Sequence, residues 1–212
     1  MISAYRYTAG VRSGMGSQTG QLIQVVLETV AANSKKNGTG EFVKDEYIKA
    51  IDNYFKNKLL PQAVFESYVD VSMAHEEFQP SSGTFMNACD GIKCFSGRYT
   101  DEVVRFNFDY WYNNSKMDGK WWADENPHSV CSTSDGAQMG VILAALYRDP
   151  EELFHKAYEL VSMWYKDPAF ITHAVVYIMS VHAFINNVPL NKYEKYLMWA
   201  VDLTGEIAGQ QN

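Results

Sequence analysis

Two Asp-Pro steps in the second half of the chain constrain its fold more than any other feature. Asp149-Pro150 is followed by Glu151 and Glu152, and Asp167-Pro168 begins the next apolar segment. Aspartate is a favoured helix N-cap, proline fits the first helical turn, and acidic residues there complement the helix dipole. Both steps therefore predict helix starts. The first of these helices has an apolar stripe at helical spacing: Leu153, Ala157, Leu160, Val161 and Trp164.

The helix predicted after Asp167-Pro168, residues 170–185, is apolar nearly all round. A helix of that kind is expected at the centre of a fold, because each of its faces needs an apolar neighbour. Pro189 is expected to end it, and Asn191 to begin a last helix. This pattern favours a layered helical globule over a four-helix bundle of one-sided helices.

The first half of the chain carries further helix signals. Apolar residues at helical spacing predict one helix from about Ser17 into the polar run 33–40, and a second from Asp45. The apolar stripe of the second consists of Tyr47, Ile48, Ile51, Tyr54 and Phe55. Further helices are expected over 61–75, from the Thr100-Asp101-Glu102 start, and from Ser134 to Tyr147. No strand alternation is evident, so we predict a compact all-α fold in a single domain, residues 1–212.

The composition excludes several classes of function. The net charge of −7 argues against binding to nucleic acid or to an acidic membrane, since both need clustered lysine and arginine. The longest apolar stretch, 173–185, contains His and Ser and is shorter than the ~20 residues of a membrane span. The three cysteines form no Cys-x-x-Cys pair. Reduced thiols and the absence of a signal-like start favour a soluble, cytoplasmic protein.

Two polar, glycine-bearing helix starts are candidate ligand sites. The first contains Ser13, Gly14, Gly16, Ser17 and Gln18, and the second contains Ser134, Asp135 and Gly136. Exposed amides at a helix start can hold an anion, and small residues let a ligand approach closely. An ordinary loop with a helix cap is the commoner explanation of such segments. Asp135 is a candidate ligand or general base, although a lone aspartate at this position is more often an N-cap.

The histidines offer no metal site by spacing. His173 and His182 lie nine residues apart and therefore on opposite faces of one helix. His75 lacks a second histidine at helical spacing, and His128 and His155 are expected in a loop and on an exposed helix face. The sequence favours structural or solvated roles for all five.

Several segments together resemble the ADP-ribosylglycohydrolase family. The run 134–147, from Ser134-Asp135-Gly136 to Leu146-Tyr147, is followed by Asp149-Pro150-Glu151-Glu152-Leu153, which is similar to the family's central signature. Upstream, 12–18 and 27–33 resemble the branch that contains the J-type lens crystallins. The resemblance covers about two thirds of the chain. It implies a helical domain with an ADP-ribose pocket between the turns 14–18 and 133–136.

The chain departs from this family at its metal site. Active members hold two magnesium ions through consecutive acids at the first helix start and through an Asp-Thr-Asp-like motif near the C-terminus. Here 15–19 offers no carboxylate, and 201–212 contains only Asp202 and Glu206. Magnesium prefers carboxylate oxygens, so the resemblance implies no metal and no catalytic residue at these positions. The alternative ligands are Asp101, in Gly-Arg-Tyr-Thr-Asp, and Asp135.

Three functions follow as hypotheses. The first is a non-catalytic, crystallin-like pseudoenzyme with a structural or protein-binding role, packed against a protein partner or in a larger assembly, with 106–122 as the contact region and possible binding of ADP-ribose. The second is a magnesium-dependent hydrolase that removes ADP-ribose from modified side chains. The third is an unrelated helical protein, such as an immunity or scaffold module. Magnesium dependence of ADP-ribose binding distinguishes them.

Overall fold

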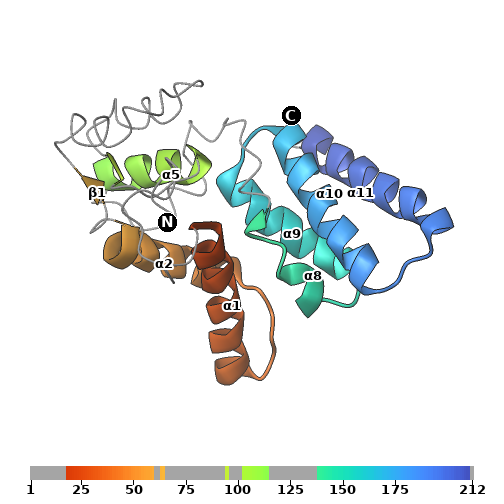
Figure 1. Cartoon of the computed structure of the whole chain (residues 1–212), viewed down its shortest axis with the longest axis horizontal. Coiled ribbons are helices and arrows are strands. Elements are labelled where there is room, and N and C mark those ends of the chain that lie inside the picture. The colour runs from red at the N-terminus through yellow and green to blue at the C-terminus, as the bar shows by residue number, and fades with distance from the viewer. Residues whose placement is uncertain (1–17, 60–62, 65–93, 96–101, 115–137, 211–212) are drawn as a thin grey trace, which may run out of the picture.

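The structure is a computed structural model of the 212-residue chain. It describes residues 18–59, 63–64, 94–95, 102–114 and 138–210. In Figure 1 the helices of the first half, α1, α2 and α5, lie on the left, and α8 to α11 lie on the right. The described residues are almost entirely helical, which confirms the prediction of an all-α, multi-helix fold.

The C-terminal helical unit consists of α9 (Pro150–Trp164), α10 (Pro168–Ile185) and α11 (Leu190–Gln210). Both Asp-Pro predictions are confirmed. Asp149 Oδ1 accepts hydrogen bonds from the amides of Glu151 and Glu152, and Asp167 Oδ1 accepts one from Ala169. The predicted apolar stripe of α9 is buried along its whole length.

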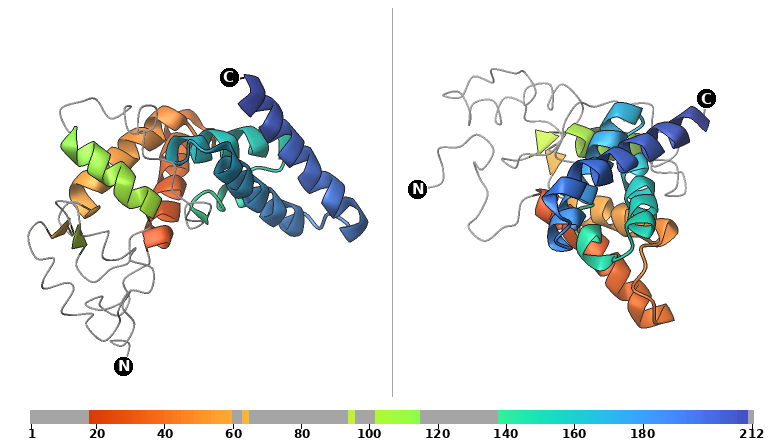
Figure 2. Two further views of the ribbon diagram at one scale, coloured as in Figure 1. Left: turned by 90° about the horizontal axis from the view of Figure 1, so that it is seen from above. Right: turned by 90° about the vertical axis from the view of Figure 1, so that its right-hand side faces the viewer.

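Helix α10 is the centre of this unit, as its sequence predicts. It packs against α8, α9 and α11, and Figures 1 and 2 show α10 and α11 side by side. The turn between them contains Asn187 in the left-handed region, with φ of 52°. Helix α11 begins at Leu190, one residue before the predicted start.

The segment before this unit differs from the prediction. A continuous helix is expected from Ser134 to Tyr147. Of its residues 139–147, which the structure describes, only α8 (Leu143–Leu146) is α-helical, and 139–142 forms turns. Hydrogen bonds from residue i+3 to residue i run through this stretch, such as Leu143 N to Gly140 O at 3.0 Å. Gly140 explains the local geometry, because a Cβ there would lie only 2.6 Å from Ile178 Cδ1. The backbone at Gly140 therefore lies in close contact with Ile178 of α10.

The N-terminal hairpin consists of α1 (Gln18–Asn37) and α2 (Lys44–Tyr54), and α2 continues into the π-helical turn η1 (Phe55–Leu59). Both helices were predicted, and all five stripe residues of α2 are buried. Helix α1 continues to Asn37, where Gly38 ends it with φ of 75°. Helix α5 (Glu102–Asn113), also predicted, is tied to α2 by Trp111, whose Nε1 donates to Asp52 Oδ1 at 2.6 Å.

Aromatic residues join the two halves of the molecule. Phe55 lies 5.6 Å from Phe108 of α5 and 6.3 Å from Trp164 of α9, measured between ring centroids. The Trp164 indole also donates a hydrogen bond to the Tyr47 hydroxyl at 3.1 Å. Phe42 donates its backbone N–H to the Tyr147 hydroxyl at 2.6 Å. A single buried core therefore runs from the hairpin into α9.

The prediction of a helix over residues 61–75 is wrong at the two residues of that range that the structure describes. Within the expected helix 61–75, Ala63–Val64 forms β1, which pairs antiparallel with β2, Cys94–Phe95. Ala63 lies opposite Phe95 in this short ladder. Pro61 suggested a helix start, but pairing with a residue some thirty positions away is a tertiary contact that local propensity does not encode.

Helix α10 also meets the length and composition of a membrane-spanning helix, with a mean hydropathy of 1.6 over its 18 residues. The expectation that there is no membrane span rests on the stretch 173–185 alone, whereas the whole helix, Pro168–Ile185, is long and apolar enough. Of this helix, 39% is buried inside the protein, and its buried residues face α8, α9 and α11. Tyr177, Phe184 and Ile185 are among its exposed residues, so the expectation that every face of this helix packs on an apolar neighbour is not met within the described residues.

Candidate functional site

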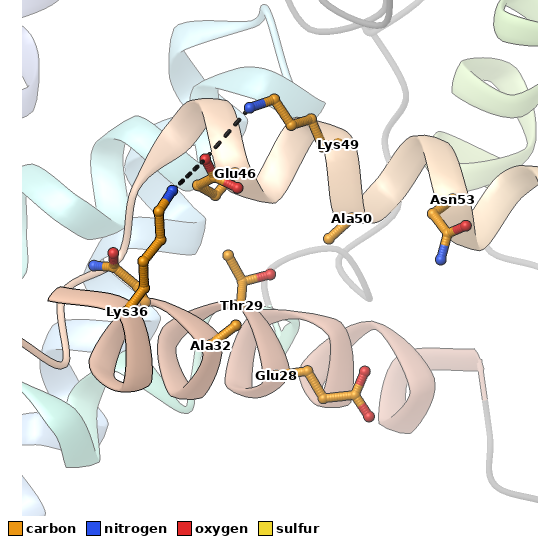
Figure 3. Close-up of a pocket in the computed structure, with 9 residues that line it drawn as sticks. Glu28, Thr29, Ala32, Lys36, Glu46, Lys49, Ala50 and Asn53 are labelled. Carbon is orange, nitrogen blue, oxygen red and sulfur yellow. Dashed lines mark hydrogen bonds and ion pairs between the residues drawn. The ribbon is translucent and has the colours of Figure 1, made fainter. Parts of the chain in front are cut away.

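A groove runs between the two helices of the N-terminal hairpin, and we call it the α1–α2 groove. It comprises two adjoining hollows of about 360 and 440 Å³, which share Glu28, Ala50 and Asn53. Figure 3 shows the first hollow, with Thr29 and Ala32 rising from α1 and Ala50 facing them from α2. The remaining lining residues are Gln21, Gln24, Val25, Asn33, Lys36, Glu46, Lys49, Tyr54, Asn57 and Lys58.

The sequence forms this groove through two helical stripes. On α1 the lining residues recur at intervals of three and four, from Gln21 to Lys36. On α2 and η1 they do the same, from Glu46 to Lys58. Residues at such intervals share one helix face, so each helix turns one polar face to the groove and its apolar stripe to the core.

Polar contacts fix the two ends of the groove. At one end Glu46 Oε1 lies 3.3 Å from Lys49 Nζ and 4.0 Å from Lys36 Nζ, and Figure 3 shows both lysines reaching the same carboxylate. At the other end the Tyr54 hydroxyl donates to Gln21 Oε1 at 3.0 Å. The start of α1 therefore lies near the end of α2. The ion pairs are exposed, so they orient the side chains more than they stabilise the fold.

Asn33 is a buried polar residue of the groove wall, and its role is structural. Its Nδ2 donates to the carbonyl of Glu41 at 3.1 Å, in the loop that connects α1 to α2. Its Oδ1 accepts a hydrogen bond from Asn37 Nδ2 at 2.6 Å. Asn33 is only 5% exposed, so these bonds satisfy an amide that would otherwise be costly to bury. They hold the loop and set the position of α2 beside α1.

Side-chain amides line the middle and far end of the groove. Gln24 Nε2 donates to Glu28 Oε1 at 2.6 Å, and Asn57 Nδ2 donates to Asn53 Oδ1. Gln24, Asn53 and Asn57 are exposed. A primary amide has two donor hydrogens and an acceptor oxygen with two lone pairs, and each of these contacts uses one of them. The amides can therefore bind further donors and acceptors, which a peptide backbone presents in alternation.

The described residues offer no metal centre, because no cluster of three or more His, Cys, Asp or Glu side chains occurs among them. The groove carboxylates, Glu28 and Glu46, are each bonded to a groove neighbour. Amides and lysines are poor ligands for magnesium. This arrangement is suited to binding by hydrogen bonds and charge, and it lacks a nucleophile with an adjacent base.

The structure covers few of the residues that the sequence singles out as ligand candidates. Gln18 is the first residue of α1, which agrees with the predicted turn-to-helix boundary. The other candidates lie outside the described residues: Ser13, Gly14, Gly16, Ser17, Asp101, Ser134, Asp135 and Gly136. Whether the two turns face each other stays a prediction.

The histidine predictions on α10 are confirmed. His173 is exposed and His182 is buried, on opposite faces of the helix. His182 Nδ1 lies 2.7 Å from the Tyr196 hydroxyl, and its Nε2 lies 3.2 Å from the carbonyl of Arg148. A carbonyl only accepts, so Nε2 carries the proton and Nδ1 accepts from Tyr196. Both ring nitrogens are thus satisfied, and His182 joins α10 to α11.

Sequence reasoning missed the α1–α2 groove. Its stripe of Gln, Glu, Asn and Lys at helical spacing was visible, but any solvated helix face has the same pattern. The hollow arises because small residues, Ala32 and Ala50, stand where the two helices approach. That approach is a tertiary feature. Comparison of the chain with protein-family models, curated proteins and solved structures found no match.

Proposed function

We propose that the chain is a non-catalytic, protein-binding helical module that receives a peptide segment of a partner in the α1–α2 groove. The observation that carries the proposal is the length and chemistry of this groove. From Gln21 to Lys36 it follows α1 for fifteen helical steps, roughly 22 Å at the helical rise. Hydrogen-bonding side chains line it throughout. A cleft of this length suits an extended segment better than a compact metabolite.

The lining favours an extended peptide over an amphipathic helix. A helix docks through apolar side chains at i, i+3 or i+4, and i+7, and it needs a continuous apolar groove to receive them. Here the aliphatic residues of the lining are Val25, Ala32 and Ala50, and they lie between amides and charges, so the groove offers no continuous stripe of large apolar side chains. An extended backbone offers unpaired N–H and C=O groups that amides can bind.

The rest of the molecule supports this role as a scaffold. The C-terminal unit buries one apolar face each of α9 and α10 and caps both helices, and Trp164 of α9 packs against Phe55 of η1 in the aromatic core. We further propose, from the sequence resemblance, that the chain is a crystallin-like, non-catalytic relative of the ADP-ribosylglycohydrolases and that it is cytoplasmic.

A peptide library tests the proposal. Random twelve-residue peptides displayed on phage are selected on the full chain and then measured against Ala32→Arg, which places a long side chain in the groove. The matched control is Ala31→Arg, the same exchange at the preceding position, which is exposed but does not line the groove. We expect selected peptides to bind wild type and Ala31→Arg equally and Ala32→Arg at least tenfold more weakly. Equal binding to all three would contradict the proposal.

The second candidate is the magnesium-dependent ADP-ribosylglycohydrolase. One observation favours it: the signature-like stretch Asp149 to Leu153 caps and begins α9, which is the structural role that the resemblance implies for it. Thermal unfolding with ADP-ribose, with and without magnesium, tests this candidate. A ligand at a hundred times its Kd stabilises a protein by about 2.7 kcal/mol. Stabilisation that requires magnesium would favour the hydrolase and point to Asp101 and Asp135. We expect none.

A further inference from the structure

The charges of the α1–α2 groove follow an order along its length. Lys49, in the first hollow, lies toward one end, and Lys58, in the second, lies at the other. Glu28 lines both hollows and therefore lies between them. The groove thus presents positive, negative and positive charge in sequence, within a chain whose net charge is −7.

The spacing of these charges matches an extended chain. Lys49 and Lys58 are nine positions apart, which on a regular α-helix would put them on opposite faces, but Lys58 lies in the π-helical turn η1 and both residues line the groove. At the α-helical rise their separation along the axis is at most about 13 Å. In an extended strand, residues i, i+2 and i+4 point to the same side, and i to i+4 spans about 13 Å. A five-residue extended segment is therefore long enough to reach from one lysine to the other, with its middle residue at the part of the groove that Glu28 lines.

The lysines differ in how much of their charge is already paired. Lys49 shares Glu46 with Lys36, so two ammonium groups face one carboxylate at that end. Lys58 is exposed, and no ion pair joins it to another described residue. Both ends of the groove therefore carry a positive charge that a carboxylate of a partner could pair with. Glu28, between them, accepts one hydrogen bond from the neutral Gln24.

We propose that the partner segment is an extended peptide with an acidic, a basic and an acidic residue at alternate positions, the acids facing Lys49 and Lys58 and the base facing Glu28. This inference rests on the proposed function, because it specifies the occupant of the same groove. Charge pairing selects this peptide over others, while the amides bind its backbone. Binding weakens with added salt, because the pairs are exposed.

Fluorescence anisotropy with two synthetic nine-residue peptides tests the inference. The first carries aspartate, lysine and aspartate at alternate positions among serine, threonine and glycine. The second has the same composition, with the lysine exchanged with the first aspartate. We expect the first to bind the full chain about three- to tenfold more tightly, since each misplaced exposed charge changes affinity by a small factor.

Charge reversal in the protein provides the matched control. Lys58→Glu is expected to weaken the first peptide three- to tenfold, and a peptide with lysine in place of the facing aspartate should regain that loss. Lys56→Glu makes the same charge change two positions earlier, on an exposed residue that does not line the groove. It is expected to leave binding within twofold of wild type.

The outcomes separate this inference from the proposed function. If peptides from the random library require an open groove at Ala32 but show no preference for this charge order, the charge inference is wrong and the proposed function stands. If both synthetic peptides bind Lys56→Glu and Lys58→Glu alike, the inference is also overturned. If no peptide of any sequence depends on Ala32, both are wrong.

Discussion

The C-terminal helical unit and the N-terminal hairpin are both helical, but they use their polar groups differently. In the C-terminal unit, Asp149 and Asp167 cap helices, and His182 bonds to Tyr196 and Arg148, so polar groups serve the fold. In the hairpin, amides and charges line an open groove, and the N-cap residue of α2, Val43, makes no side-chain capping hydrogen bond. The comparison suggests that one region provides stability and the other provides binding chemistry.

The largest expected effect comes from breaking the connection between the two regions. Trp164 is fully buried, packs on Phe55 and donates a hydrogen bond to Tyr47. Trp164→Ala should lower the free energy of unfolding by about 3–5 kcal/mol, measured by urea denaturation. Phe184→Ala is the control, because Phe184 is 82% exposed, and it should change stability by less than about 0.5 kcal/mol. Similar losses for both would contradict the connection.

The next effect concerns the close approach of α10 to the segment before α8. Gly140→Ala should destabilise by about 1–3 kcal/mol, because the new methyl group would meet Ile178 Cδ1 at 2.6 Å and Leu160 Cδ2 at 3.2 Å. Adding Ile178→Val removes the nearer methyl group, so the double variant should lose less than the sum of the single losses. Gly205→Ala, where a Cβ meets nothing within 4 Å, should instead stabilise slightly. Additive losses would exclude the steric explanation.

Variants of the N-cap residues of α9 and α2 allow the stability of the two regions to be compared directly. Asp149→Ala removes an acceptor for two backbone amides and should cost about 0.5–2 kcal/mol of unfolding free energy. Val43→Ser supplies α2 with an acceptor that it lacks, at a residue whose φ of −122° and ψ of 116° suit an N-cap. We expect a gain of up to about 1 kcal/mol. A loss at Val43 would mean that its own packing outweighs the missing cap.

The smallest effect is a pH dependence in alkaline solution. Burial, with a contribution from the Asp149 carboxylate, raises the pKa of Tyr196 from 10.0 to about 12. Between these values the unfolded chain loses a proton that the folded chain keeps, so stability falls as pH rises through this window. Tyr196→Phe should make the decline shallower in urea titrations from pH 9 to 12. An unchanged slope would contradict the assignment.

How far the sequence predicts this molecule depends on whether the signal is local. The starts of α9 and α10 were predictable because Asp149 and Asp167 each bond to amides two or three residues away. The pairing of Ala63 with Phe95 was not, because it depends on a distant partner. The turns at 139–142 were missed for the same reason, because the backbone at Gly140 packs closely against the side chain of Ile178, which lies on α10.

The candidate site was harder to predict than the fold. The polar stripes of α1 and α2 are evident in the sequence, yet only their packing leaves a hollow at Ala32 and Ala50. The ligand turns suggested by the family resemblance, around Gly14 and Asp135, lie outside the described residues and stay predictions. Sequence reasoning therefore found the scaffold from its local signals and missed the groove, which depends on the approach of two helices.

Amide hydrogen exchange of the full chain, alone and with the acidic–basic–acidic peptide, tests the division between scaffold and binding face most directly. In the free protein the slowest exchange should occur in α9 and α10, whose amides lie in the packed unit. On adding the peptide, new protection should appear over residues 21–58 and leave the exposed turn after Phe184 unchanged. Protection confined to α10 and α11 would contradict the assignment of binding to the hairpin.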